Sequence, residues 1–250
     1  MQLKETRMSI AIGLSGLIPG THELIAELTE RLSTGEAFDN PKLTLTADRV
    51  FGGSRAKGTY SPRDAYDAME TAVNRLLLGD RAEELMRMSV DEALASLRSL
   101  TAQLPRQSDR TMEQTEFQQF STPPALAFII AKLLGAKPAD VVLEPSAGTG
   151  SLAIWPRSIG ARVICNEINV RRRVLLIDEL GFETHSVDAE IIDDLLPTDI
   201  QPTAILMNPP FSATGGRVVQ RSSIYGARHI EGSLRRLHEG DVLSPSWARG

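Results

Sequence analysis

The feature that most constrains the fold is a series of short apolar runs that each end in a polar residue. The runs read VVLE, RVICNE, THSVD and AILMN, and they end at Glu144, Glu167, Asp188 and Asn208. Successive end residues lie 23, 21 and 20 positions apart. The intervening segments LAIWPRSIG, NVRRRVLLIDELG and AEIIDDLL have helical length or period. This alternation predicts an α/β fold with a parallel sheet that helices cover on both faces.

The first part of the chain reads as helices without recognisable chemistry. An apolar stripe follows Thr21 in HELIAELTERL, Ser61-Pro62-Arg63-Asp64 is a helix start, and Ser89 with Glu92 forms a capping-box pattern. The composition changes near Pro105, where a polar segment begins. We therefore expect a helical accessory region over 1–110 and a second domain over 111–250.

Composition excludes several classes. The single cysteine, Cys165, allows no internal disulfide, and its apolar neighbours indicate a buried thiol in a reducing compartment. No apolar stretch reaches the roughly 20 residues that span a bilayer, so we expect a cytoplasmic protein without a membrane partner. The histidines show no metal-ligand spacing with cysteines, and we predict no zinc site. The net charge of -5 gives no global nucleic-acid signature.

A glycine-rich turn follows the first expected strand. In EPSAGTGSLA, Gly148, Gly150 and Ala153 fit the dinucleotide fingerprint, and Glu167 follows at the distance expected for an acid that binds ribose hydroxyls. Glycines allow a tight turn that lets a ligand lie against bare backbone at a helix start. From these residues alone, a nicotinamide cofactor and S-adenosylmethionine fit equally well.

A rigid corner follows the fourth expected strand. The segment MNPPF contains Asn208, Pro209, Pro210 and Phe211, and two successive prolines forbid helix and remove two backbone donors. Such a corner either stops a strand or holds Asn208 and Phe211 in fixed positions around a planar ligand. The pentapeptide alone leaves both interpretations open.

Taken in order, the motifs resemble a known family. FSTPP, LEPSAGTG, NE, VD and MNPPF are similar to the motif series of amino-group DNA methyltransferases that use S-adenosylmethionine, in the class whose methionine-pocket motif comes first. The resemblance covers about residues 115 to 240. A weaker likeness is to the methyltransferase segment of phage and plasmid proteins related to strawberry-notch helicases, some of which are associated with anti-restriction. The resemblance implies a Rossmann-like methyltransferase sheet.

The resemblance also implies roles for individual residues. Asn208, Pro209, Pro210 and Phe211 would form the catalytic corner. The methionine part of the cofactor would pack against Phe120, Thr122 and Pro123. The glycine turn and its preceding acid would contribute Glu144, Ala147, Gly148 and Gly150. Glu167 would bind the ribose, and Asp188 would face the adenine.

The implied acceptor is the exocyclic N6 amine of adenine in DNA. The Asn208 side-chain oxygen and the Pro209 carbonyl would each accept one of its N–H groups, and Phe211 would stack on the base. Asn at 208 and Phe at 211 are compatible with adenine, whereas a Ser-Pro-Pro version more often serves cytosine N4. Two alternatives stay open: a methyltransferase acting on protein glutamine or RNA, and a non-catalytic nucleic-acid-binding module.

The chain after the proline corner is rich in arginine. Arg217 and Arg221 are candidates for phosphate contacts, and a merely solvated face is the alternative. We expect 171–173, Arg-Arg-Arg, to be solvated. DNA is the expected partner, with a helicase or specificity region in the same or another chain, within a restriction-modification or anti-restriction system.

The sheet predicted from the sequence is incomplete. The resemblance implies seven strands, of which four are placed, and DVL after the helix HIEGSLRRLHEG begins a fifth that Pro245 does not sustain. We therefore expect a methyltransferase domain that is truncated after four to five strands.

Overall fold

The fold is built on one parallel sheet. The computed structural model describes residues 16–105, 121–208, 222–237 and 242–245, and statements on structure refer to these ranges. Five strands lie in the order β3-β2-β1-β4-β5, with every neighbouring pair parallel. The predicted α/β class with a Rossmann-like sheet is confirmed. The strands are β1 (Val141–Glu144), β2 (Arg162–Asn166), β3 (Glu183–His185), β4 (Ala204–Met207) and β5 (Val242–Pro245).

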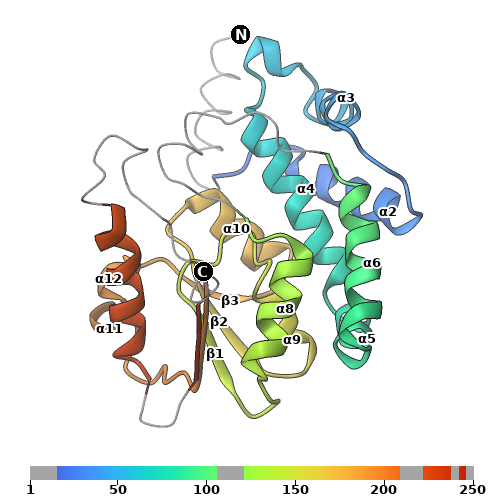
Figure 1. The fold of residues 1–250 in the computed structure, drawn as a ribbon. Helices are drawn as coiled ribbons and strands as arrows, with labels where there is room; N and C mark the ends of the chain where they lie inside the picture. Colours follow the sequence, from blue (N-terminus) through green and yellow to red (C-terminus); the bar gives the residue numbers. More distant parts are fainter. Residues whose placement is uncertain (1–15, 106–120, 209–221, 238–241, 246–250) are drawn as a thin grey trace, which may run out of the picture.

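Alternate strand residues face two different helical layers. Leu143, Ile164, Ile205 and Met207 belong to a cluster with Ile192 of α11 and, at its edge, Ile230 of α12. Their neighbours along the strands face the opposite layer, as the two-residue period of a strand requires: Val142, Val163, Cys165, Ala204 and Leu206. Figure 1 shows α11 and α12 on one side of the sheet and α8 and α9 on the other.

Helices cover both faces of the sheet, and α12 begins at Ser222, seven residues before the predicted start at His229. On one face are α8 (Pro124–Leu134), α9 (Ile154–Ser158) and α10 (Val170–Asp178), and on the other α11 (Ile192–Leu195) and α12 (Ser222–Leu234). The Asn169 side chain caps α10 by accepting a hydrogen bond from the Arg172 amide. A short 3-10 helix, η2 (Ala189–Ile191), joins β3 to α11.

The N-terminal part is helical, as predicted. Its elements are α2 (Thr21–Ser33), α3 (Asn40–Val50), η1 (Arg55–Lys57), α4 (Pro62–Leu77), α5 (Asp80–Arg87) and α6 (Val90–Ala102). The predicted capping box of Ser89 with Glu92 forms on α6, and the predicted helix start at Ser61 is also a capping box, with Asp64 on α4. Each satisfies backbone donors that a helix start otherwise leaves without partners.

The helical part and the sheet share one hydrophobic core. A single cluster of buried side chains runs from Leu24 and Leu28 of α2, through Leu77 of α4, to Phe128 of α8 and Trp155 of α9. The rings of Phe128 and Trp155 meet edge to face, with centroids 5.3 Å apart. The helices therefore pack directly against one layer of the sheet.

None of the helices in the described ranges is long and apolar enough to cross a bilayer.

Two boundaries differ from those predicted. The third strand ends at His185, three residues before Asp188, because the chain turns there and the Asp188 side chain accepts a hydrogen bond from the Glu190 amide to start η2. The fifth strand continues to Pro245, which pairs with Met207. Pro245 is the last residue of a strand with one neighbour in the described sheet, so its missing N–H interrupts no ladder.

The glycine turn after β1 packs tightly against α10. Gly150 has a φ of 88°, and a Cβ added there would lie 2.9 Å from Leu176 Cδ2 and 3.2 Å from Leu180 Cδ1. Gly135, after α8, has a φ of 64°, and a Cβ added there would have no other atom within 4 Å. The two glycines therefore share a left-handed backbone and differ in their surroundings.

We predict that Gly150→Ala destabilises the protein more than Gly135→Ala. Both variants bear the cost of a left-handed alanine, about 1–2 kcal/mol, and Gly150→Ala also overpacks the turn, at about 1–3 kcal/mol. Urea unfolding of the two variants measures the difference. Equal free energies of unfolding would contradict the close packing at Gly150.

Candidate active site

Three predicted site residues lie at one edge of the sheet. Glu167, Glu144 and Asn208 stand at or just after the carboxyl ends of β2, β1 and β4, which are adjacent in the sheet. Leu143 pairs with Ile205, so Glu144 and Asn208 stand at the same ends of neighbouring parallel strands. Neighbouring strands lie roughly 4.8 Å apart. In open α/β sheets this edge is where ligands bind.

Glu167 fixes the glycine turn. One carboxylate oxygen accepts a hydrogen bond from the Gly148 amide at 2.8 Å, and the other accepts one from the Asn169 amide at 2.7 Å. Gly148 has a φ of 60°, which glycine adopts without strain. Burial raises the pKa of Glu167, while Arg172 and these two amides act to lower it. The carboxylate thus joins the turn after β1 to the start of α10.

Glu144 is a buried acid with an unsatisfied oxygen. Its side chain is 2% exposed, and Oε2 has no hydrogen-bond partner among the described residues. Burial raises the pKa of Glu144 well above its ordinary value, and the charge of Glu167 raises it further. A buried acceptor without a partner is costly and therefore uncommon. It lies directly before the glycine turn, where a cationic or hydrogen-bonding ligand group would satisfy it.

Asn208 meets the segment that precedes α8. Its Nδ2 donates a hydrogen bond to the Thr122 hydroxyl at 3.1 Å, across 86 positions of sequence. Thr122 is buried, and Pro123 is the residue directly before α8. The structure thus brings together one residue from FSTPP and one from MNPPF.

The turns around the site are held by a residue that sequence reasoning missed. Asn166, 1% exposed, donates hydrogen bonds to the carbonyls of Pro145 and Val187 and accepts one from the Val187 amide. The Asn166 carbonyl also accepts from the Ala147 amide. Asn166 therefore ties the turns after β1 and β3 to β2. In the sequence, the position of Asn166 directly before Glu167, at the end of a strand, is the signal that could have indicated this role.

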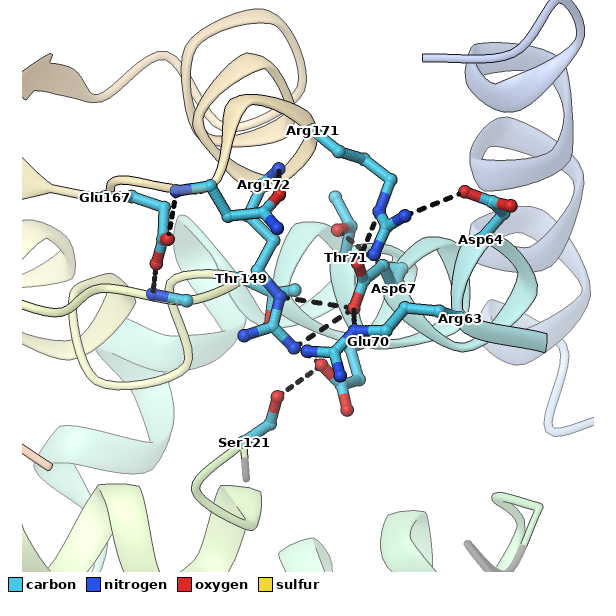
Figure 2. Close-up of polar contacts among 12 residues, drawn as sticks. Arg63, Asp64, Asp67, Glu70, Thr71, Ser121, Thr149, Glu167, Arg171 and Arg172 are labelled. Atoms are coloured by element: carbon cyan, nitrogen blue, oxygen red, sulfur yellow. Dashed lines mark hydrogen bonds and ion pairs between the residues drawn. The ribbon is translucent and has the colours of Figure 1, made fainter. Parts of the chain in front are cut away.

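Helix α4 also contacts the site, which the sequence did not predict. Asn74 donates a hydrogen bond to the Thr149 carbonyl at 2.7 Å, and Glu70 accepts hydrogen bonds from the hydroxyls of Ser121 and Thr149. Figure 2 shows Glu70 of α4 beside Ser121 and Thr149. The first helical part of the chain thus holds both the turn and the segment before α8.

The expectation that 171–173 is solvated is wrong for two of its three arginines. Arg172 is 5% exposed and pairs with the buried Asp67 of α4, and Arg171 pairs with Asp64 and Asp67. Burial alone would raise the pKa of Asp67, and the surrounding arginines reverse this and lower it. These ion pairs join α4 to α10 (Figure 2).

The arginines of α12 and of the turn after it form ion pairs and hydrogen bonds with other residues of the protein. Arg228 pairs with Glu190, Arg235 with Asp193 and Glu231, and Arg236 donates to the carbonyls that end α11, including that of Asp193 at 2.6 Å. These side chains are therefore engaged with η2 and α11.

On α12, His229 lies 3.2 Å from the Ser146 hydroxyl in the turn after β1, and burial lowers the pKa of His229.

Several predicted site residues lie outside the described ranges. They are Phe120, Pro209, Pro210, Phe211, Arg217 and Arg221. Asp188 lies within the described ranges and is exposed. It stands two residues before Glu190, which accepts a hydrogen bond from Arg228 of α12. The roles assigned to all of these residues stay predictions.

A search of known proteins finds a sequence match over part of the chain. Over 99 residues the chain is 36% identical to the ribosomal RNA small subunit methyltransferase A of Thermotoga petrophila. The sequence match is to a methyltransferase. It takes in 39% of this chain and 38% of that protein, so the chain spans less than two fifths of the length of the curated relative it matches. No family model matches the chain.

Two solved structures are similar in part. TrmN from Thermus thermophilus has a TM-score of 0.40 at 20% identity, over 56% of this chain and 46% of that chain. The type I restriction-modification system methyltransferase subunit from Streptococcus thermophilus has a TM-score of 0.37 at 14% identity, over 96% and 59%. The sequence match supports the methyltransferase class, with S-adenosylmethionine as its cofactor, and does not distinguish DNA from RNA.

We predict that Glu144→Gln stabilises the protein at neutral and alkaline pH. The folded chain holds the Glu144 proton more tightly than the unfolded chain, whose ordinary pKa is 4.5, so the wild type loses stability as the pH rises above that value. Glutamine does not titrate. The melting temperature of the variant should exceed that of the wild type by about 2–4 °C per kcal/mol gained, and the gap should close below pH 4.5.

Thermal melts across pH check this prediction. Glu84→Gln, on the exposed face of α5, is the control and should leave the pH dependence unchanged. A Glu144→Gln variant that is less stable than the wild type at pH 8 would show that the carboxylate is stabilised as an anion.

Proposed function

We propose that this chain transfers a methyl group from S-adenosylmethionine to the N6 amine of adenine in DNA. The supporting observation is the hydrogen bond between Asn208 and Thr122. It joins the segment implied to bind the methionine part of the cofactor to the residue implied to hold the acceptor amine. A methyl donor and its acceptor must meet at such a junction.

The cofactor site fits the groups present. Glu167 lies at the end of β2, where an acid binds ribose hydroxyls, and each of its oxygens has used one lone pair on a backbone amide. Glu144 has a buried oxygen that a bound ligand would satisfy. S-adenosylmethionine supplies an electrophilic methyl group on a positively charged sulfur. A nearby carboxylate favours that charge, so Glu144 suits the sulfonium side.

Asn208 positions the acceptor. The lone pair of an exocyclic amine is delocalised into the base, which makes the nitrogen a poor nucleophile. When the Asn208 oxygen and the Pro209 carbonyl accept its two N–H groups, the amine rotates and its lone pair becomes available. The hydrogen bond from the Asn208 amide nitrogen to the Thr122 hydroxyl restricts rotation of the Asn208 side chain. Fixed dipoles and alignment then provide the rate without a strong base.

DNA is preferred as the substrate because FSTPP precedes the glycine turn. In a duplex, the adenine must be flipped out of the helix to reach this edge. RNA is the second candidate, favoured by the match to a ribosomal RNA methyltransferase. We place the chain in a restriction-modification or anti-restriction system, alongside a specificity or helicase region.

The acceptor is tested with S-adenosylmethionine labelled in its methyl group. The purified chain is incubated in parallel with duplex DNA, single-stranded DNA, ribosomal RNA and a cell protein extract. Mass spectrometry of the digested products should find labelled N6-methyladenine in DNA. Label confined to RNA or to glutamine would contradict the DNA proposal. Failure to bind S-adenosylhomocysteine in calorimetry would favour a non-catalytic module.

We predict that Asn208→Ala separates binding from catalysis. The variant should bind S-adenosylhomocysteine within about twofold of the wild type, while kcat falls by about 100- to 1,000-fold, because a fixed dipole at the reacting amine is lost. Calorimetry and methyl-transfer assays measure the two quantities. Asn40→Ala, on α3, removes an amide away from the sheet edge and should change neither. Equal losses of binding and transfer in Asn208→Ala would contradict the assigned role.

A further inference from the structure

Three cofactor-binding elements meet at one face of α4. Asp67, Glu70 and Asn74 lie along this face at positions i, i+3 and i+7, and they contact the start of α10, the residue before Thr122 and the glycine turn. No motif in the sequence marks this face. The contacts join parts of the chain that are 51 to 105 positions apart.

Arg172 is held by α4 with one nitrogen unused. Its Nε and Nη2 donate to Asp67 Oδ1 at 3.3 and 3.2 Å. Its Nη1 makes no hydrogen bond with any residue in the described ranges, and lies 3.8 Å from where a Cβ on Gly148 would be. The residue is 5% exposed. A guanidinium nitrogen beside the bare backbone of the turn is a donor suited to a carboxylate.

Glu70 supplies the opposite charge next to it. Its carboxylate accepts hydrogen bonds from Ser121 and Thr149, so it lies where the segment before α8 meets the glycine turn. The charge of Glu70 also acts on Arg172 and raises its pKa, which places the two groups within electrostatic reach. Figure 2 shows both side chains at the junction of α4 with the turn.

We propose that Glu70 and Arg172 bind the α-ammonium and the α-carboxylate of the amino-acid end of S-adenosylmethionine. The inference rests on the proposed cofactor. An amino acid is a zwitterion whose two charges are a few ångströms apart, and Glu70 and Arg172 supply one charge of each sign within a cluster that also contains Arg63, Arg171 and Asp67. Glu167, which suits the ribose, lies on the other side of Gly148 from the α4 contacts. Asp67 fixes the guanidinium before the ligand arrives, which lowers the cost of ordering it.

The alternative is that the same network only docks α4 on the sheet. A pair of ligands separates the two roles: S-adenosylhomocysteine, which contains the amino-acid end, and 5′-methylthioadenosine, which contains the same nucleoside and thioether without it. A structural role would affect the binding of both compounds equally. A zwitterion site would affect the first alone.

Isothermal titration calorimetry with both compounds tests the proposal. Wild type should bind S-adenosylhomocysteine more tightly than 5′-methylthioadenosine. Glu70→Gln, which keeps an acceptor for Ser121 and Thr149 but removes the charge, should weaken S-adenosylhomocysteine binding by about 10- to 100-fold. Its affinity for 5′-methylthioadenosine should stay within twofold. Arg172→Lys, which keeps a charge for Asp67, should give the same pattern.

Glu84→Gln, on the exposed face of α5, is the matched control and should change neither affinity. Thermal melts show whether each variant is folded. Equal affinity of wild type for the two compounds, or equal losses for both in Glu70→Gln, would overturn the zwitterion site and leave the proposed function standing. Binding of neither compound to wild type would overturn the proposed function, and this inference with it.

Discussion

The site depends on the carboxylate of Glu167, which accepts hydrogen bonds from the amides of Gly148 and Asn169. These two bonds fix the turn after β1 against the start of α10, and hence the position of Arg172, whose own amide is capped by Asn169. Burying an acid is costly, and the raised pKa of Glu167 expresses that cost. Two charge-assisted hydrogen bonds to backbone amides offset part of it. The result is a turn that is formed before any ligand binds.

Helix α4 makes the first helical part of the chain a component of the site. Its apolar side packs in the core that continues from α2 to α8 and α9, and its polar side carries the ion pairs with Arg171 and Arg172 and the contacts to Thr149. Breaking a buried ion pair leaves an uncompensated charge, which typically costs several kcal/mol. The geometry of the glycine turn is therefore coupled to the packing of a helix far away in the sequence.

The sequence predicted the parts of this structure that depend on local patterns. Alternation of apolar runs and helices gave the parallel sheet, and capping residues gave the starts of α4 and α6. Contacts between distant segments were not predictable. No motif marks Asp67 and Asn74, which are buried where α4 meets α10 and the glycine turn. Arg171 and Arg172 read as solvated because their partners on α4 are distant in the sequence. The strand that includes Pro245 depends on pairing with β4, which overrides local preference, whereas the turn at Asp188 is a local hydrogen bond to the Glu190 amide.

We propose that the carboxyl ends of β2, β1 and β4, together with α4, form one site for cofactor and acceptor. A crystal structure of the chain with S-adenosylhomocysteine tests this proposal most directly. We expect ribose hydroxyls at Glu167, sulfur on the side of Glu144 that faces Asn208, and the amino-acid end at Glu70. The hollow at the opposite edge of the sheet, lined by Pro138, Arg157 and Glu183, should hold no ligand. Density for the nucleoside in that hollow, with the glycine turn unoccupied, would contradict the proposed site.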